Sequence, residues 1–219
     1  MSLKFVVLAL MLLGSGLARA ASAPVIDDRY LIHFSAERTR LTLAYIRQHY
    51  DPQATSIRIK PVMVVIHWTA SPTLAAALAE LTPDTLMGRA DIRSGGALNV
   101  GAHYLVDRDG TIYRLIDDTL LARHVIGLNR SAIGIENVGS NNLTAAQLRA
   151  DARLVASLNG EYALEYLIGH FEYGRFKGSA LWEEKQAGYF TRKTDPGAAF
   201  MAALRANLAG QGVMLKSTP

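Results

Sequence analysis

The sequence has no cysteine among its 219 residues. A disulfide is therefore excluded, and so is attachment to a lipid through an N-terminal cysteine. The chain also lacks internal repeats and low-complexity stretches, and only 19% of its residues are charged, a composition unlike that of disordered or fibrous proteins. Because half of the residues are hydrophobic, the chain can bury a sizeable core without cross-links, and its length suggests one domain.

A strong charge of either sign is also missing. The formal net charge is +4, and two of these charges, Lys4 and Arg19, lie in an N-terminal segment that we expect to be removed. That segment contains no acid, so the rest of the chain carries a net charge of +2. Such a weak charge gives no reason to expect a nucleic-acid partner.

The N-terminus has the pattern of a secretory signal peptide over residues 1–20. Lys4 precedes the apolar run Phe5–Leu13, and Ala18-Arg19-Ala20 offers small residues where a signal peptidase cleaves. The run is short for a membrane span, although an uncleaved N-terminal anchor is the alternative. We therefore expect export to the periplasm or the cell exterior, with no stable membrane insertion after cleavage.

The remaining chain shows a pattern of strands alternating with helices. Pro61–Trp68 is a continuous β-branched run, typical of a strand buried on both faces. Thr144 and Gln147 form the signature of a capping box at the start of a long helix. The other expected elements are helices over 36–49, 74–81 and from Pro196 onward, and strands over 102–106, 111–116, 132–137 and 166–169.

One pair of these strands differs from the rest because a tight turn, Asp107–Gly110, joins them as a hairpin. The sequence therefore predicts an α/β fold, a single domain with a mixed central β-sheet flanked by helices on its faces. Residues 21–60 form an N-terminal extension with a helix, in which we expect 21–35 to be an irregular lead-in. We expect a monomer, with its active residues on loops at the strand ends.

Two of the six histidines stand where predicted strands end. His67 lies near the end of the most apolar strand, and His170 follows the strand 166–169. A histidine at the junction of a buried strand and a loop has a rigid backbone and can direct its ring into a cleft, as a metal ligand must. For either histidine alone, a core residue hydrogen-bonded to the backbone is the alternative interpretation.

Two carboxylates also stand in informative positions. Strand alternation places Gly134 and Glu136 on the same face, and a residue without a side chain indicates that another group approaches closely there. An exposed strand glutamate is the alternative for Glu136. Asp195 precedes Pro196 and fits the N-cap of a helix with proline at its first position, but a carboxylate has two oxygens and can have a second role.

Together these segments resemble the zinc amidase family that includes bacterial N-acetylmuramoyl-L-alanine amidases and animal peptidoglycan-recognition proteins. The resemblance runs in family order from about residue 62 to 200. Its most specific parts are the AHY-x-VDRDGTIY block, the IGIE strand and the KTDPG sequence. The matched segments are Val65–His67, Asn99–Tyr113, Ala122–His124, Ser131–Glu136, Gly169–His170 and Lys193–Gly197.

The resemblance implies one zinc ion per chain, bound by His67, His170 and Asp195 with water as the fourth ligand. This set of two imidazoles and one carboxylate leaves the open position that a hydrolytic zinc needs. By the same resemblance Glu136 is the general base and Lys193 stabilises the oxyanion. The implied reaction is hydrolysis of the amide between N-acetylmuramic acid and L-alanine, in peptidoglycan or muropeptides.

The same resemblance assigns His124 to the substrate cleft. His103 points from a predicted strand, and we expect it to be a structural residue, not a ligand. It also sets the expected domain limits. The zinc amidase domain would span residues 61–210, after the extension 21–60, and residues 211–219 would form a C-terminal tail.

The chain departs from the compact family pattern between His170 and Asp195, which lie 25 positions apart. The insert, Phe171–Thr191, is rich in aromatic residues and can form a lid over the cleft or pack on the core. Two other functions stay open: a module that binds peptidoglycan without cutting it, and a zinc peptidase acting elsewhere on the stem peptide. The presence of Asp195, Glu136 and Lys193 together favours the enzyme over the binding module.

Overall fold

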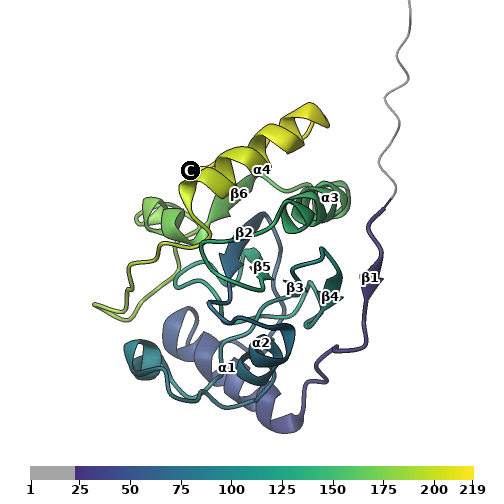
Figure 1. Cartoon of the computed structure of the whole chain (residues 1–219). Helices are drawn as coiled ribbons and strands as arrows, with labels where there is room; N and C mark the ends of the chain where they lie inside the picture. Colours follow the sequence, from purple (N-terminus) through teal and green to yellow (C-terminus); the bar gives the residue numbers. More distant parts are fainter. Residues whose placement is uncertain (1–22) are drawn as a thin grey trace, which may run out of the picture.

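A computed structural model describes residues 23–219, and Figure 1 shows the arrangement of its elements. The signal peptide expected over residues 1–20 lies outside the described residues. Within residues 23–219, no helix is both long and apolar enough to cross a lipid bilayer.

Six strands form one sheet in the order β1-β4-β3-β5-β2-β6. β3 and β4 pair antiparallel, whereas the other neighbouring strands are parallel, so the predicted mixed sheet is confirmed. The strands are β1 (Ile26–Asp27), β2 (Met63–Trp68), β3 (Tyr104–Val106), β4 (Ile112–Arg114), β5 (Ala132–Asn137) and β6 (Tyr166–Gly169).

Helices cover both faces of this sheet. Figure 1 shows α3 and α4 on one side of the strands and α1 and α2 on the other. The predicted capping box is confirmed, because Thr144 Oγ1 accepts from Gln147 N at 3.1 Å and Gln147 Oε1 accepts from Thr144 N at 2.9 Å. The α-helices are α1 (Ala36–His49), α2 (Leu74–Leu81), α3 (Ala145–Tyr162) and α4 (Ala198–Gly210), with 3-10 helices at Ala90–Gly95 and His170–Phe176.

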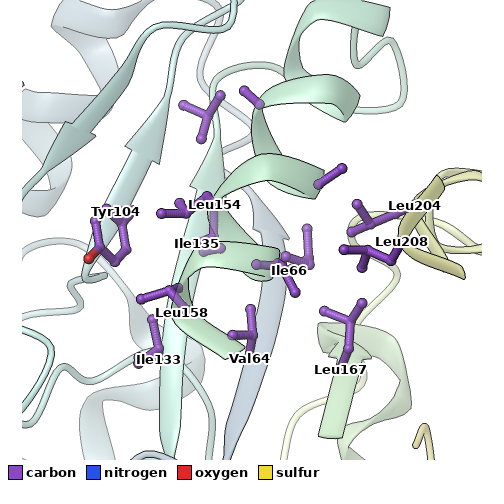
Figure 2. Packing of buried hydrophobic residues seen from close by; sticks show 14 of the residues in the cluster. Val64, Ile66, Tyr104, Ile133, Ile135, Leu154, Leu158, Leu167, Leu204 and Leu208 are labelled. Atoms are coloured by element: carbon purple, nitrogen blue, oxygen red, sulfur yellow. The ribbon is translucent and has the colours of Figure 1, made fainter. Parts of the chain in front are cut away.

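Side-chain alternation along the central strands separates the core from the site. Val64 and Ile66 of β2 point with their β5 neighbours toward α3 and α4, where Figure 2 shows them packed against leucines of both helices. Met63 and Val65 point to the opposite face and pack against loops and the insert. His67 continues this second series, so the alternation directs its ring away from the helices α3 and α4.

The N-terminal lead-in and the hairpin differ from the prediction. Residues 21–35 were expected to be irregular, but Ile26–Asp27 pairs in parallel with Ile112–Tyr113 and forms the edge strand β1. A two-residue strand has no periodicity that a sequence can show, because only its distant partner defines it. The hairpin strands β3 and β4 are also shorter than the expected ranges 102–106 and 111–116.

The start of the last helix is a second correction. α4 begins at Ala198 with Gly197 as its N-cap, so Pro196 is not the first helical residue and Asp195 does not cap the helix. The side chain of Asp195 points instead to a histidine, with Oδ2 at 3.1 Å from His170 Nδ1. A contact between loops overrides the local preference of an Asp-Pro pair for a helix start.

The insert Phe171–Thr191 packs on the core. Tyr173, Phe176 and Tyr189 are buried beside the central strands. The insert is also bound to α1, because Lys185 N donates to His49 O at 2.9 Å.

Candidate metal centre and cleft

Three side chains from distant parts of the chain meet at the ends of two neighbouring strands. His67 stands on β2 and His170 directly follows β6, and the parallel pairing of Ile66 with Gly169 brings the two histidines side by side. Their Nδ1 atoms are 2.9 Å apart. Oδ2 of Asp195 lies 3.1 Å from His170 Nδ1 and 3.3 Å from His67 Nδ1, and all three residues are buried.

These separations fit the ligands of one small divalent ion. Zinc binds imidazole nitrogen and carboxylate oxygen at about 2.0–2.2 Å, so two ligand atoms of a tetrahedral site lie about 3.3 Å apart. The three separations in the structure, 2.9, 3.1 and 3.3 Å, equal this value or lie slightly below it. Two imidazoles and one carboxylate also leave a fourth position for water or substrate, which is the donor set of hydrolytic zinc sites.

His124 fixes which nitrogen of His67 faces this cluster. His124 Nε2 lies 3.2 Å from the carbonyl of Ala132, which can only accept, so the proton of the neutral ring is on Nε2. Its Nδ1 then accepts from His67 Nε2 at 3.0 Å. With its proton on Nε2, the ring of His67 presents an unprotonated Nδ1 to the cluster, as a metal ligand needs.

The sequence predicted that another group approaches Gly134 closely, and this group is the ring of His124. A Cβ at Gly134 would lie 2.7 Å from His124 Cγ, closer than two such carbon atoms can pack. Only glycine lets this ring lie flat on β5. His103, which the sequence assigned a structural role, accepts from Gly134 N at 2.9 Å and contacts Leu120 O at 3.0 Å with its other nitrogen.

Burial and contacts give His170 and Asp195 protonation states suited to metal binding. Burial lowers the pKa of His170 to about 4, so its ring is neutral at pH 7. Burial alone would raise the pKa of Asp195, but the adjacent rings of His170 and His67 outweigh this effect and hold the pKa below its usual range. A neutral imidazole and an ionised carboxylate are the forms that bind metal.

Glu136 lies beside the cluster on the neighbouring strand, paired in register with His67. Burial raises the pKa of Glu136 to about 7, although His67 opposes the rise. Its Oε2 has no hydrogen-bond partner within the described part of the chain. A carboxylate with this pKa, buried and without a partner for one oxygen, has the properties of a proton acceptor at neutral pH.

Lys193 completes the charged groups around the cluster. It is largely buried, and its Nζ lies 3.9 Å from Asp91 Oδ2. Burial lowers the pKa of Lys193, and the nearby Arg89 guanidinium adds to this effect.

The ligands, catalytic residues and cleft residue that the sequence predicted all line one cleft of about 440 Å³. They are His67, His124, Glu136, His170, Lys193 and Asp195. Sequence reasoning missed several residues that also line it, among them Tyr45 of α1, Arg123, and Tyr189 of the insert. Arg123 stood within a segment of the family resemblance, but nothing in its pattern indicated a role. Tyr45 and Tyr189 gave no signal, because their place in the cleft depends on how α1 and the insert fold back.

Comparison with known proteins identifies the family. Residues 58–198 match the sequence model of the N-acetylmuramoyl-L-alanine amidases, and this match covers more than half of the chain. The chain belongs to this family. The matched residues include the three clustered side chains, Glu136 and Lys193, but not α1.

Individual relatives align with a smaller part of the chain than the family model does. The endolysin of Klebsiella phage KP32 is 32% identical over 85 residues, which are 35% of this chain and 56% of the endolysin. Peptidoglycan-recognition protein SC2 of Drosophila melanogaster is 27% identical over 128 residues, 55% of this chain and 70% of that protein. The chain thus spans little more than half the length of the endolysin.

Among solved structures, the chain resembles the N-acetylmuramyl-L-alanine amidase AmiD of E. coli, in complex with the substrate anhydro-N-acetylmuramic acid-L-Ala-D-γ-Glu-L-Lys. The TM-score is 0.50 at 23% identity, and the alignment covers 74% of this chain and 61% of AmiD. At this identity the likeness shows a shared fold, and it agrees with the mixed α/β domain described above.

Proposed function

We propose that this protein is a zinc-dependent hydrolase that cleaves the amide between the lactyl group of N-acetylmuramic acid and L-alanine, in peptidoglycan or muropeptides. The observation that supports it most is the convergence of His67, His170 and Asp195 beside Glu136 in one cleft. We place the catalytic domain at residues 61–210. The proposed site of action is the periplasm or the cell exterior, in keeping with the signal pattern over residues 1–20.

In this proposal, a single zinc ion would be held by Nδ1 of His67, Nδ1 of His170 and a carboxylate oxygen of Asp195. When bound, zinc supplies a Lewis acid for the amide carbonyl and makes water acidic enough to lose a proton near neutral pH. The spacing of the three ligand atoms supports this assignment.

Glu136 moves the proton. Its carboxylate accepts a proton from water as the water oxygen bonds to the carbonyl carbon of the lactyl group. The C–N bond then breaks, and Glu136 returns the proton to the amino nitrogen of L-alanine, which leaves as the free amine. The unpartnered Oε2 and the pKa of about 7 support this role, since the group can both accept and donate near pH 7.

Lys193 and His124 assist without exchanging atoms with the substrate. The Lys193 ammonium stabilises negative charge on the carbonyl oxygen while the carbon is tetrahedral. His124 lines the cleft and holds the ring of His67 through its hydrogen bond to Nε2.

The test is digestion of N-acetylmuramoyl-L-Ala-D-γ-Glu-L-Lys by the zinc-loaded chain, with the products weighed by mass spectrometry. The proposal predicts free N-acetylmuramic acid and a tripeptide that begins with L-alanine, and no products after zinc is removed with a chelator. Cleavage within the peptide would identify a peptidase instead. Binding of the muropeptide without any product would identify a recognition module.

A further inference from the structure

Two arginine side chains are fully buried in the described part of the chain, Arg38 at 2% and Arg123 at 4% exposure. Arg38 has a carboxylate partner, because its Nε lies 2.8 Å from Asp84 Oδ1. Arg123 takes part in no ion pair formed by residues 23–219, and it contacts only neutral groups. Since buried charges in proteins are normally paired, the guanidinium of Arg123 stands out as a cation without its anion.

The hydrogen bonds of Arg123 leave one donor unused. A guanidinium has five N–H groups. Nη1 donates to the carbonyls of Gly96 and Leu98, and Nη2 donates to Ile92 O at 2.6 Å and to Tyr189 Oη at 2.8 Å. Within residues 23–219, no acceptor takes the Nε–H, and these neutral acceptors do not balance the positive charge.

Tyr189, which is hydrogen-bonded to Arg123, offers a second unused donor. Its hydroxyl oxygen accepts from Arg123, so the hydroxyl hydrogen is available to donate. No other side-chain hydrogen bond involves this hydroxyl within the described residues. The two donors therefore belong to residues that both line the cleft and that are joined by the hydrogen bond from Arg123 Nη2 to Tyr189 Oη. This pair of donors matches the two oxygens of a carboxylate.

Arg123 and Tyr189 lie close to the proposed metal ligands. Arg123 directly precedes His124, whose Nδ1 is 3.0 Å from the proposed ligand His67. Tyr45 of α1 forms the wall behind Arg123, whose guanidinium carbon lies 5.0 Å from the ring centroid. A cleft of about 440 Å³ holds the reacting amide and only a few residues beyond it. An anion bound by Arg123 and Tyr189 therefore belongs to a part of the substrate near the scissile bond.

We propose that Arg123 and Tyr189 form a subsite that binds a carboxylate of the stem peptide and selects substrates that carry it. This inference rests on the proposed amidase function. It also gives the insert a role, since Tyr189 belongs to the insert and supplies one of the two donors.

The wild-type chain tests this subsite without any substitution. The reference substrate is N-acetylmuramoyl-L-Ala-D-γ-Glu-L-Lys, in which the γ-linked glutamate has a free α-carboxylate and the lysine has a C-terminal carboxylate. Two matched substrates carry a carboxamide in place of one carboxylate or the other. Loss of a charge-assisted pair of hydrogen bonds should raise KM at least about tenfold for one of them, with kcat within about twofold.

If neither carboxamide changes KM by more than about twofold, the subsite is overturned while the amidase function stands. If no substrate is hydrolysed at all, the proposed function fails instead, and so does the inference built on it.

Variants assign the effect to the two residues. In Arg123→Gln, the ratio of the KM for the carboxamide substrate to the KM for the reference substrate should fall close to one. In Tyr189→Phe, which keeps the aromatic ring, the same ratio should fall to an intermediate value. Arg130→Gln is the matched control, because Arg130 lies in the same part of the chain but pairs with Glu183 outside the cleft. If Arg123→Gln fails to fold, Tyr189→Phe decides, and an unchanged ratio in that variant overturns the assignment.

Discussion

Glu136 shows how the fold gives an ordinary side chain an unusual proton affinity. β2 and β5 pair so that this glutamate lies in register with His67, and its Oε2 is buried. Burial disfavours the charged carboxylate and raises the pKa of Glu136 to about 7. A strand glutamate in water would stay ionised down to about pH 4 and would be a weaker base.

Substitution of Glu136 by glutamine tests its role in proton transfer. Glutamine keeps the shape but cannot accept the proton, so we expect kcat to fall about 10²–10⁴-fold. Zinc content should not change, because the proposed ligands are untouched. Steady-state kinetics and metal analysis on the same preparation measure both quantities. Activity within a few-fold of wild type would remove Glu136 from the mechanism.

His124 should control metal affinity through His67. Substitution of His124 by alanine removes the acceptor for His67 Nε2–H and frees the ring to rotate. Removal of such an outer partner typically weakens metal binding 10–100-fold, and we expect a zinc Kd raised by about that factor. Competition with a chromophoric chelator measures it. His103→Ala is the control, since His103 contacts the backbone of Gly134 and Leu120, not the ligand. An unchanged Kd in His124→Ala would refute the positioning role.

Asp151 on α3 gives a prediction about stability and pH. Burial raises the pKa of Asp151 to about 7, although the hydrogen bond from Asn137 opposes the rise. Oδ1 of Asp151 and Oδ1 of Asn137 are both buried without partners in the described residues, an arrangement that suits a neutral acid donating to the amide. The acid is thus favoured in the folded state, whereas the unfolded chain ionises near pH 4.

The sign of the effect follows from this difference. The contribution of Asp151 to stability is fully present below about pH 4 and is lost as the pH rises to about 7. Asp151→Asn keeps the donor and cannot ionise, so it should raise the free energy of unfolding by roughly 1–3 kcal/mol at pH 8 and change it little at pH 4.5. Urea unfolding with chelator present at both pH values measures this. A variant less stable than wild type at pH 8 would contradict a neutral Asp151.

At the scale of elements, α1 and the insert hold each other in place at one end of the cleft. His49 on α1 faces acceptors with both ring nitrogens, Nδ1 at 2.8 Å from Glu184 Oε1 and Nε2 at 3.1 Å from Gly95 O. Gln48 donates to Gln186 Oε1 at 2.9 Å. These contacts make the insert a fixed wall, and the lid that the sequence also allowed is not what the structure describes.

Removal of Glu184 should therefore destabilise the fold. Both members of the His49–Glu184 pair are buried, and breaking a buried pair costs about 3–5 kcal/mol. Glu184→Ala should lower the free energy of unfolding by roughly that amount. The neighbouring Glu183→Ala is the matched control, since Glu183 forms a partly exposed pair with Arg130 and should change stability by less than about 1 kcal/mol. Equal effects in chemical unfolding would show that the buried contact does not hold the insert.

Elements with local signals could be predicted, and those defined by distant partners could not. The β-branched run ending in His67 and the Thr144 capping box carry their structure within a few residues. β1 consists of two residues, and these form a strand only because they pair with β4. Asp195 followed by proline favoured a helix cap locally, but the contact with His170 across the fold prevailed.

At the scale of the whole molecule, the candidate site follows from the order of strands in the sheet. β2 lies between β5 and β6, so the residues at the ends of these three strands meet at one edge. The sequence could place His67, Glu136 and His170 at strand ends, and the family resemblance joined them to Asp195. It could not find Arg123 or Tyr189, because their meeting depends on how α1 and the insert fold over the cleft.

The most direct test of the central claim is zinc binding by the purified chain and by Asp195→Ala, measured by elemental analysis and titration. We expect about one zinc per wild-type chain, and a Kd raised by several orders of magnitude in the variant, because three protein ligands would be reduced to two. A wild-type chain that binds no zinc, or an Asp195→Ala variant that binds it with unchanged affinity, would contradict a metal shared by His67, His170 and Asp195.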